Sequence, residues 1–352
     1  MGKYLVKQEE IMKKALSLLL ILMLTFSLAT GCAPKAEEET TAAPAETTAA
    51  AEETTAAAAD PEFDNVFVNI GTGGTAGTYF PLGGAFAEIW NNNIKGINAT
   101  AQSTGASVAN INLLVDGEVE VIIVQNDTAM YAYEGSQMFD GVPFDKLRGL
   151  ATLYSEPLQI VTTDPNIKTI ADLKGKNVAV GAIGSGVEAN ARQIIAAAGM
   201  DFEKDINAKF LSFAEASSGL KDKQVDAAFL TAGIPTAAIQ DLSAQNDVFI
   251  VAIDGDVAAT LKSNYKFFTD YVIPANTYKG QTADVATLTV KSMLCVSADM
   301  EDDLAYALTK QIYENLDRVV LAHNVGKFIT KETALEAMPI PMHPGAERYF
   351  NE

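Results

Sequence analysis

Hydrophobic and polar positions follow a strand, loop, helix order along most of this chain. Residues 66–70 are a short run rich in β-branched side chains, and a glycine-rich stretch then leads to apolar positions at helical spacing up to Trp90. The same order recurs after residues 97–102 and 119–124. Repeated strand and helix units with short loops predict parallel strands in an α/β layer.

A long extended stretch interrupts this order in the middle of the chain. Residues 147–163 are too many for an ordinary strand, so we expect this stretch to cross between two domains. An amphipathic pattern over 302–323 predicts one long helix. We expect a first domain made of 62–156 and 255–352 and a second domain of 157–254. A small-molecule cleft is expected between the two domains.

The N-terminal segment has the pattern of an export signal. Two lysines precede an uncharged apolar run at 15–29, which is shorter than a membrane span of about 20 residues. The run ends in Leu-Ala-Thr-Gly-Cys, which resembles a bacterial lipoprotein box and makes Cys32 the predicted site of lipidation. Residues 1–31 are thus a predicted signal peptide. The alternative is cleavage near Gly31 and release of a free secreted protein.

Composition and charge narrow the function further. Residues 32–61 are almost entirely Ala, Glu, Thr and Pro, which predicts a tether that cannot order itself. The chain of 352 residues is 48% apolar, enough for a large core, and its formal charge of −20 disfavours nucleic acid as a partner. Only two His and two Cys are present, which disfavours a zinc site and a His-dependent triad. We expect a monomer without cofactor, metal or enzymatic activity, which meets the membrane only through its N-terminal lipid.

Three loops rich in small residues follow predicted strands in similar places. The loops at 71–77, 103–105 and 184–186 each open a helix, whose free backbone N–H groups can bind an anion. The chain has only four arginines and none lies in these loops, so backbone and hydroxyl donors are expected to hold a carboxylate. The first loop loosely fits a dinucleotide motif. No acidic residue closes the next strand, however, so a nicotinamide cofactor is not expected.

The predicted ligand contacts lie in these loops, at the ends of neighbouring strands and in the crossing stretch. Tyr79 and Tyr154 are candidate pocket walls, and Glu156 could accept a ligand ammonium. The alternatives are core tyrosines, a solvated Glu156 and ordinary turns. The predicted ligand-binding residues are Gly73, Gly74, Thr75, Thr78, Tyr79, Ser103, Thr104, Gly105, Gln125, Asn126, Tyr154, Glu156, Gly184, Ser185, Gly186, Ala232 and Gly233.

Short motifs occur in a fixed order over the folded part. They are IGTGGTAGTYFPLGG at 70–84, LYSEP at 153–157, LKGK at 173–176, VGAIGSG at 180–186, LSFAEA at 211–216, IPANTY at 273–278 and HPGAERY at 343–349. With them, the sequence from about residue 66 to the end resembles the TAXI family of TRAP transporter solute-binding receptors. The resemblance implies an α/β, two-domain type II periplasmic-binding-protein fold and a TRAP membrane permease as partner. It also implies a small acidic solute such as glutamate, glutamine or 2-oxoglutarate.

The sequence therefore predicts an extracytoplasmic, lipid-anchored solute receptor. Solute that bridges the two domains would close them about strands near 154–159 and 250–255. The nearest alternative is a substrate-binding lipoprotein of an ABC importer. An exported α/β enzyme would need a nucleophile paired with a base, for which no motif is present. A tethered adhesin or sensor domain would lack a small-molecule cleft.

Overall fold

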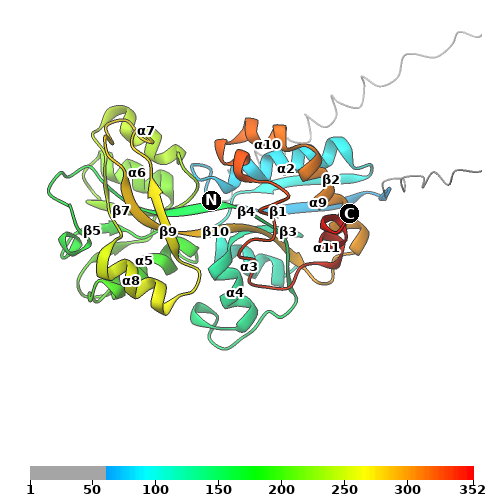
Figure 1. Cartoon of the computed structure of the whole chain (residues 1–352), viewed down its shortest axis with the longest axis horizontal. Helices are drawn as coiled ribbons and strands as arrows, with labels where there is room; N and C mark the ends of the chain where they lie inside the picture. The colour runs from blue at the N-terminus through cyan, green and yellow to red at the C-terminus, as the bar shows by residue number, and fades with distance from the viewer. Residues whose placement is uncertain (1–60) are drawn as a thin grey trace, which may run out of the picture. The chain divides into compact units, whose positions relative to one another are not determined.

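The computed structural model describes residues 61–352. The predicted signal peptide, the lipidation site at Cys32 and all but the last residue of the predicted tether lie outside the described residues. The described residues belong to one structural unit in which strands and helices alternate (Figure 1). Within them, no helix combines the length and the apolar character needed to cross a bilayer.

The elements of this unit follow the order that the hydrophobic pattern predicts. The strands are β1 Val66–Gly71, β2 Ile97–Gln102, β3 Val121–Gln125, β4 Leu147–Thr162, β5 Asn177–Ala179, β6 Asn207–Lys209, β7 Ala227–Thr231, β8 Phe249–Val251, β9 Thr269–Ile273 and β10 Val285–Ser297. The α-helices are α2 Tyr79–Asn93, α3 Ser107–Val115, α4 Asn126–Glu134, α5 Gly186–Ala197, α6 Phe213–Lys221, α7 Ala237–Gln245, α8 Gly255–Asn264, α9 Asp302–Glu314, α10 Leu316–Ala322 and α11 Pro344–Phe350.

The strands form two lobes with the same internal order. In lobe 1, β2, β1 and β3 are parallel. Strand β10 follows antiparallel to β3, and β4 follows antiparallel to β10. In lobe 2, β6, β5 and β7 are parallel, and β4 and β8 follow. This repeated order, with shared strands between the lobes, is that of a two-lobed periplasmic-binding-protein fold, and it confirms the predicted fold class.

Strand β4 belongs to both lobes. Its first part, up to Pro157, pairs with β10, and its last part, from Leu158, pairs with β7 and β8. The extended stretch predicted at 147–163 is therefore one continuous strand of 16 residues. Figure 1 shows β4 and β10 side by side where lobe 1 passes into lobe 2. In such sheets, ligands bind beyond the carboxyl ends of the parallel strands.

Two details of the sequence prediction are corrected by the structure. The helix predicted over 302–323 is broken at Asn315, whose side-chain Nδ2 donates to the Gln311 carbonyl at 2.8 Å and competes with the helical backbone. The second connection between the lobes was expected near 250–255, but the strand that joins them is β10, which pairs with β9 of lobe 2 at its start and with β3 of lobe 1 at its end. Long-range pairing of this kind leaves no local signal in the sequence.

The domain boundaries stay a prediction, and we propose one change to them. The hydrophobic cluster of lobe 2 around Val178 and Ile194 also contains Ala258, Leu261 and Phe268, which the sequence assigned to the first domain. We therefore propose that lobe 2 continues through α8 and β9, up to the first residues of β10.

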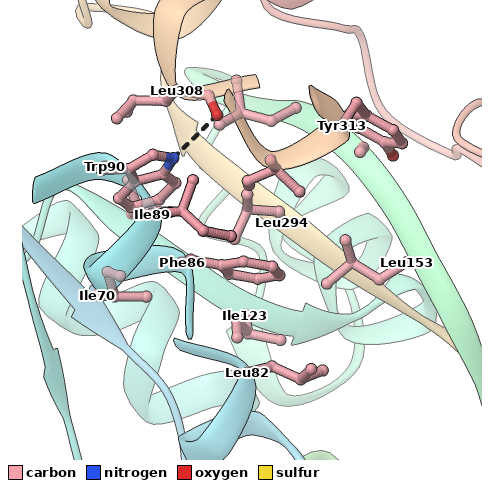
Figure 2. Packing of buried hydrophobic residues seen from close by; sticks show 14 of the residues in the cluster. Ile70, Leu82, Phe86, Ile89, Trp90, Ile123, Leu153, Leu294, Leu308 and Tyr313 are labelled. Atoms are coloured by element: carbon pink, nitrogen blue, oxygen red, sulfur yellow. Dashed lines mark hydrogen bonds between the residues drawn. The ribbon is translucent and has the colours of Figure 1, made fainter. Parts of the chain in front are cut away.

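The core of lobe 1 is built around the chain's single tryptophan. Trp90 on α2 is fully buried, and its Nε1–H donates to the Leu308 carbonyl of α9 at 2.9 Å (Figure 2). Phe86, one turn earlier, stacks on its ring with centroids 6.2 Å apart. The indole thus joins α2 and α9, two helices that are far apart in the sequence, and fixes their packing in lobe 1.

Replacing Trp90 by phenylalanine should lower the free energy of unfolding by about 2–3 kcal/mol. The variant Trp90→Phe leaves a cavity and removes the donor to Leu308. Urea unfolding followed by far-UV circular dichroism measures the loss. As a control, Phe67→Leu changes a side chain that is 57% exposed and should cost less than about 0.5 kcal/mol. Equal stabilities of the two variants would contradict the role given to Trp90.

Candidate functional site

One cavity is lined by loops from both lobes. Its atom-free space is about 600 Å³, part of it open to solvent. Lobe 1 contributes the loops before α2 and α3, the last residue of β3 and Glu156 of β4. Lobe 2 contributes the loops before α5 and α6 and the end of β7. The lining residues are Gly73, Gly74, Gly77, Thr78, Tyr79, Thr104, Gly105, Ala106, Ser107, Gln125, Glu156, Ala182, Ser185, Gly186, Val187, Ser212, Phe213, Thr231 and Ala232.

The glycine-rich loop after β1 is held by a buried asparagine. The Nδ2 group of Asn110 on α3 donates to the carbonyls of Gly71 at 3.1 Å and Thr72 at 2.6 Å. Thr104 adds a hydrogen bond from its Oγ1 to the Thr72 carbonyl at 3.0 Å, and Ser103 donates to Gly73 at 3.0 Å. Buried carbonyl groups need such partners, so the loop has a defined path at the cavity wall.

The helix N-termini around the cavity are not equally available to a ligand. The backbone N–H groups of Val108 and Ala109, at the start of α3, already donate to the Gly184 carbonyl of lobe 2 at 3.1 Å each. The start of α5 is capped by Ser185, whose Oγ accepts from the Glu188 N–H at 3.1 Å. Two N–H groups at the start of α3 are therefore paired with the other lobe, and the expectation that three helix ends bind a carboxylate stays a prediction.

Glu156 is the only acid among the lining residues, and it is buried. Its Oε2 accepts from the Tyr79 hydroxyl at 2.8 Å and its Oε1 from the Tyr154 hydroxyl at 3.1 Å. Burial raises the pKa of Glu156 to about 8, although the two tyrosine hydrogen bonds act against this rise. No Lys, Arg or His lines the cavity. Glu156 is thus not a solvated charge, and it is largely protonated at neutral pH.

Buried polar side chains link the lobes beside the cavity. Asn190 on α5 accepts from Gln125 Nε2 at 2.9 Å and donates to Asp127 Oδ2 at 2.9 Å. One turn further, Gln193 donates to the Tyr131 hydroxyl at 3.2 Å. Burial raises the pKa of Asp127, and the hydrogen bond from Asn190 opposes this rise. These contacts require the lobes to be close together, so the structure represents a closed form.

Most of the predicted ligand-binding residues meet at the cavity. Gly73, Gly74, Thr78, Tyr79, Thr104, Gly105, Gln125, Glu156, Ser185, Gly186 and Ala232 line it. They come from six separate segments: five loops and strand ends, which the rule of carboxyl strand ends predicted to converge, and the middle of β4, where Glu156 lies. Their contact with a ligand stays a prediction.

The other predicted residues lie behind or beside the wall. Thr75 is exposed, and Tyr154 reaches Glu156 from the core. Asn126 instead accepts from the Lys291 N–H at 3.0 Å and holds β10. Gly233 accepts from the Thr236 hydroxyl at 2.9 Å. The remaining two, Ser103 and Gly184, support the loop after β1 and cap α3 as described above.

Sequence reasoning missed several lining residues. They are Gly77, Ala106, Ser107, Ala182, Val187, Ser212, Phe213 and Thr231. A signal was available for Ser212 and Phe213, because they follow the strand β6 and open the helix α6, where Ser212 forms a capping box with Glu215. Ser107 likewise occupies the first position of α3. The strand–loop–helix rule that found the other loops applies to the loops of Ser107 and Ser212 as well.

Arg192, His343 and Cys295 make contacts that stabilise the fold. Arg192 pairs with Glu203 at 2.8 Å on the surface of α5. His343 is buried, and its Nδ1 accepts from the Gly345 N–H at 3.2 Å, which caps α11. Cys295 is buried in β10, where burial raises the pKa of its thiol. None of the three lines the cavity.

The fold and the cavity between its lobes define a protein of the periplasmic-binding-protein class. The chain belongs to the NMT1-like family, whose model matches residues 70–352. The structure is similar to the alkanesulfonate-binding protein SsuA from Xanthomonas axonopodis pv. citri bound to MOPS, with 17% identity, a TM-score of 0.45 and coverage of 84% of this chain and 85% of that one. It is also similar to a periplasmic substrate-binding protein of an ABC transporter from Coxiella burnetii, with 15% identity, a TM-score of 0.40 and coverage of 76% and 98%. An ancestral arginine-binding protein bound to arginine has 16% identity, a TM-score of 0.45 and coverage of 75% and 97%.

Proposed function

We propose that this protein is an extracytoplasmic receptor that captures a small solute between its lobes and delivers it to a membrane importer. The observation that carries the proposal is the cavity lined by loops of both lobes. Clefts between domains are preferred sites for small molecules. Solute contacts to both lobes would favour the closed form, since a ligand shifts a conformational equilibrium by its differential affinity. We propose no chemical reaction for the protein.

We propose an amino acid, or a solute of similar size and polarity, as the ligand. Backbone N–H groups of the glycines and hydroxyl groups of the wall can donate to a carboxylate, while the carboxyl group of Glu156, neutral when protonated, can donate or accept one further hydrogen bond. A purely anionic solute would meet no cationic side chain in the cavity. Of the predicted solutes, this favours glutamine and glutamate over 2-oxoglutarate.

We propose two kinds of transporter, in order, as the partner that receives the solute. The description of the matched family names no transporter type, so it does not support the TRAP assignment. The structures of similar fold that name a transporter are ABC proteins. We therefore propose an ABC importer as the first partner to test and a TRAP permease, to which the sequence motifs point, as the second.

The anchoring of the receptor also stays a proposal. We propose that Cys32 is acylated and that residues 33–61 hold the receptor near the membrane. Intact-mass measurement of the protein from its native membrane tests this. A mass increase on a mature chain that begins at Cys32, lost in Cys32→Ser, is expected. A chain cut at another residue with no added mass would overturn the proposal.

A thermal-shift screen tests the receptor function. The folded part is mixed with about 1 mM of glutamine, glutamate, aspartate, arginine, 2-oxoglutarate, succinate or an alkanesulfonate. A solute at 1,000 times its Kd should stabilise the protein by about 4 kcal/mol and raise Tm by several degrees. Mass spectrometry of the denatured protein identifies any solute that is already bound. An empty protein that responds to no solute would contradict the proposed receptor function. Co-purification of the receptor with an ABC permease or with a TRAP permease would decide between the two transporter types.

A further inference from the structure

A chain of three buried polar side chains crosses between the lobes at the cavity wall. Asp127 on α4 and Gln125 at the end of β3 belong to lobe 1, and Asn190 on α5 of lobe 2 lies between them. All three are at most 2% exposed. Buried polar groups of this kind adopt the orientation that satisfies their hydrogen bonds, so the orientation of each one depends on its neighbours.

Asp127 determines which way the Asn190 amide faces. Both carboxyl oxygens of Asp127 act as acceptors: its Oδ1 receives the Thr128 N–H at 2.7 Å and its Oδ2 receives Asn190 Nδ2 at 2.9 Å. Asp127 also lies in the first turn of α4, where the helix dipole favours a carboxylate. The same Asn190 amino group donates to Gln193 Oε1 at 3.4 Å. A reversed Asn190 would place its carbonyl oxygen against both of these oxygens.

Asn190 in turn determines which way the Gln125 amide faces. The Oδ1 atom of Asn190 accepts from Gln125 Nε2 at 2.9 Å and from the Thr231 hydroxyl at 3.1 Å. The Oε1 atom of Gln125 therefore points away from Asn190 and has no hydrogen-bond partner in the part of the chain that the structure describes. It occupies the space left by the missing side chain of Gly186, near Ser107, and all three residues line the cavity. An unpaired buried carbonyl is costly, and a donor from a solute would relieve that cost.

We infer that Asp127, acting through Asn190, is a positioning residue that makes Gln125 present a hydrogen-bond acceptor to the solute. The cavity then selects a solute with an N–H or O–H donor, such as an amino acid, over its keto-acid counterpart. The inference rests on the proposed function of the cavity as a solute site. We call the hydrogen-bonded chain Asp127, Asn190 and Gln125 the relay. Since the relay joins the two lobes, Gln125 Oε1 has the correct orientation only in the closed form.

The variant Asp127→Asn tests the relay by reversing its polarity. An asparagine at this position can donate to Asn190, which lets Asn190 and Gln125 turn over and present Gln125 Nε2 to the cavity. Calorimetric Kd values are compared for amino acid and keto acid pairs, beginning with L-glutamate and 2-oxoglutarate. We expect the native protein to prefer the amino acid by about tenfold or more, and Asp127→Asn to reduce this ratio by about tenfold. An unchanged ratio in a folded variant would overturn the inference.

Two matched variants separate the relay from charge and packing. Asp241→Asn removes the same charge from an exposed position of α7 and should leave the ratio as it is. Gln125→Glu keeps an acceptor toward the cavity and should retain the preference for the amino acid, even if both affinities fall. A loss of preference in either variant that matches that of Asp127→Asn would contradict the relay.

A readout without any solute keeps the relay distinguishable from the receptor function. In ¹⁵N-labelled protein, Asp127→Asn should shift the side-chain amide signals of Gln125, identified by their loss in Gln125→Glu, and Asp241→Asn should not. Shifted signals in a protein that binds none of the solutes would support the relay and contradict the receptor function. Unshifted signals would overturn the relay whichever solutes bind.

Discussion

At pH 8.5, the variant Glu156→Gln should be more stable than the native protein. Between pH 5 and pH 8.5, the difference between their free energies of unfolding should shift in favour of the variant by up to about 4 kcal/mol. Burial raises the pKa of Glu156 to about 8, whereas a glutamate in an unfolded chain titrates near its ordinary value. Between these two pKa values, the folded state holds a proton that the unfolded state has released. The free energy of unfolding of the native protein therefore falls as the pH rises from about 4.5 to about 8, and little further change follows above that range.

The glutamine variant lacks this proton and keeps the shape of the side chain. Its amide can still contact the hydroxyls of Tyr79 and Tyr154, which can turn to suit it. Urea unfolding at several pH values gives the two curves. Glu314→Gln, at an exposed end of α9, is the control and should follow the native slope. Parallel slopes for the native protein and Glu156→Gln would show that Glu156 is ionised throughout the range.

Gly186→Ala should weaken solute binding by roughly 5- to 150-fold while the solute-free protein stays folded. A Cβ atom on Gly186 would overlap Gln125 Oε1 across the lobes, and it would also approach the Ser107 hydroxyl at 3.1 Å. Gln125 would have to turn aside, and loss of its hydrogen bond to Asn190 would cost about 1–3 kcal/mol in the closed form. The open form has no such overlap, and alanine suits the first position of α5.

Gly74→Ala is the matched control for this variant. Gly74 lines the same cavity, but its added Cβ would meet only the Ser212 Cβ at 4.0 Å, an ordinary contact. Titration calorimetry with the solute that gives the largest thermal shift measures both variants. Equal affinities for Gly186→Ala and Gly74→Ala would mean that the contact between Gly186 and Gln125 is not needed for binding.

The local sequence predicted the elements of the site well, because their signals lie within a few residues. The alternation of strand and helix identified the loops of Gly73, Gly105 and Gly186, and the shared rule about strand ends predicted that they meet. The same rule could have found Ser107 and Ser212. Tyr154 and Glu156 were found in the crossing stretch, but their burial and their mutual hydrogen bond could not be.

The sequence by itself determined the α/β class, the long crossing strand β4 and most of the residues that line the cavity. These features follow from periodicity, glycine placement and strand length, which are local properties of the chain. Only the tertiary structure decided the rest: that β10 runs beside β4, that Gly184 of one lobe caps a helix of the other, and that Asp127 and Asn190 form one relay. Contacts between residues 60 or more positions apart depend on how the lobes pack, and a single sequence carries no periodic signal for them.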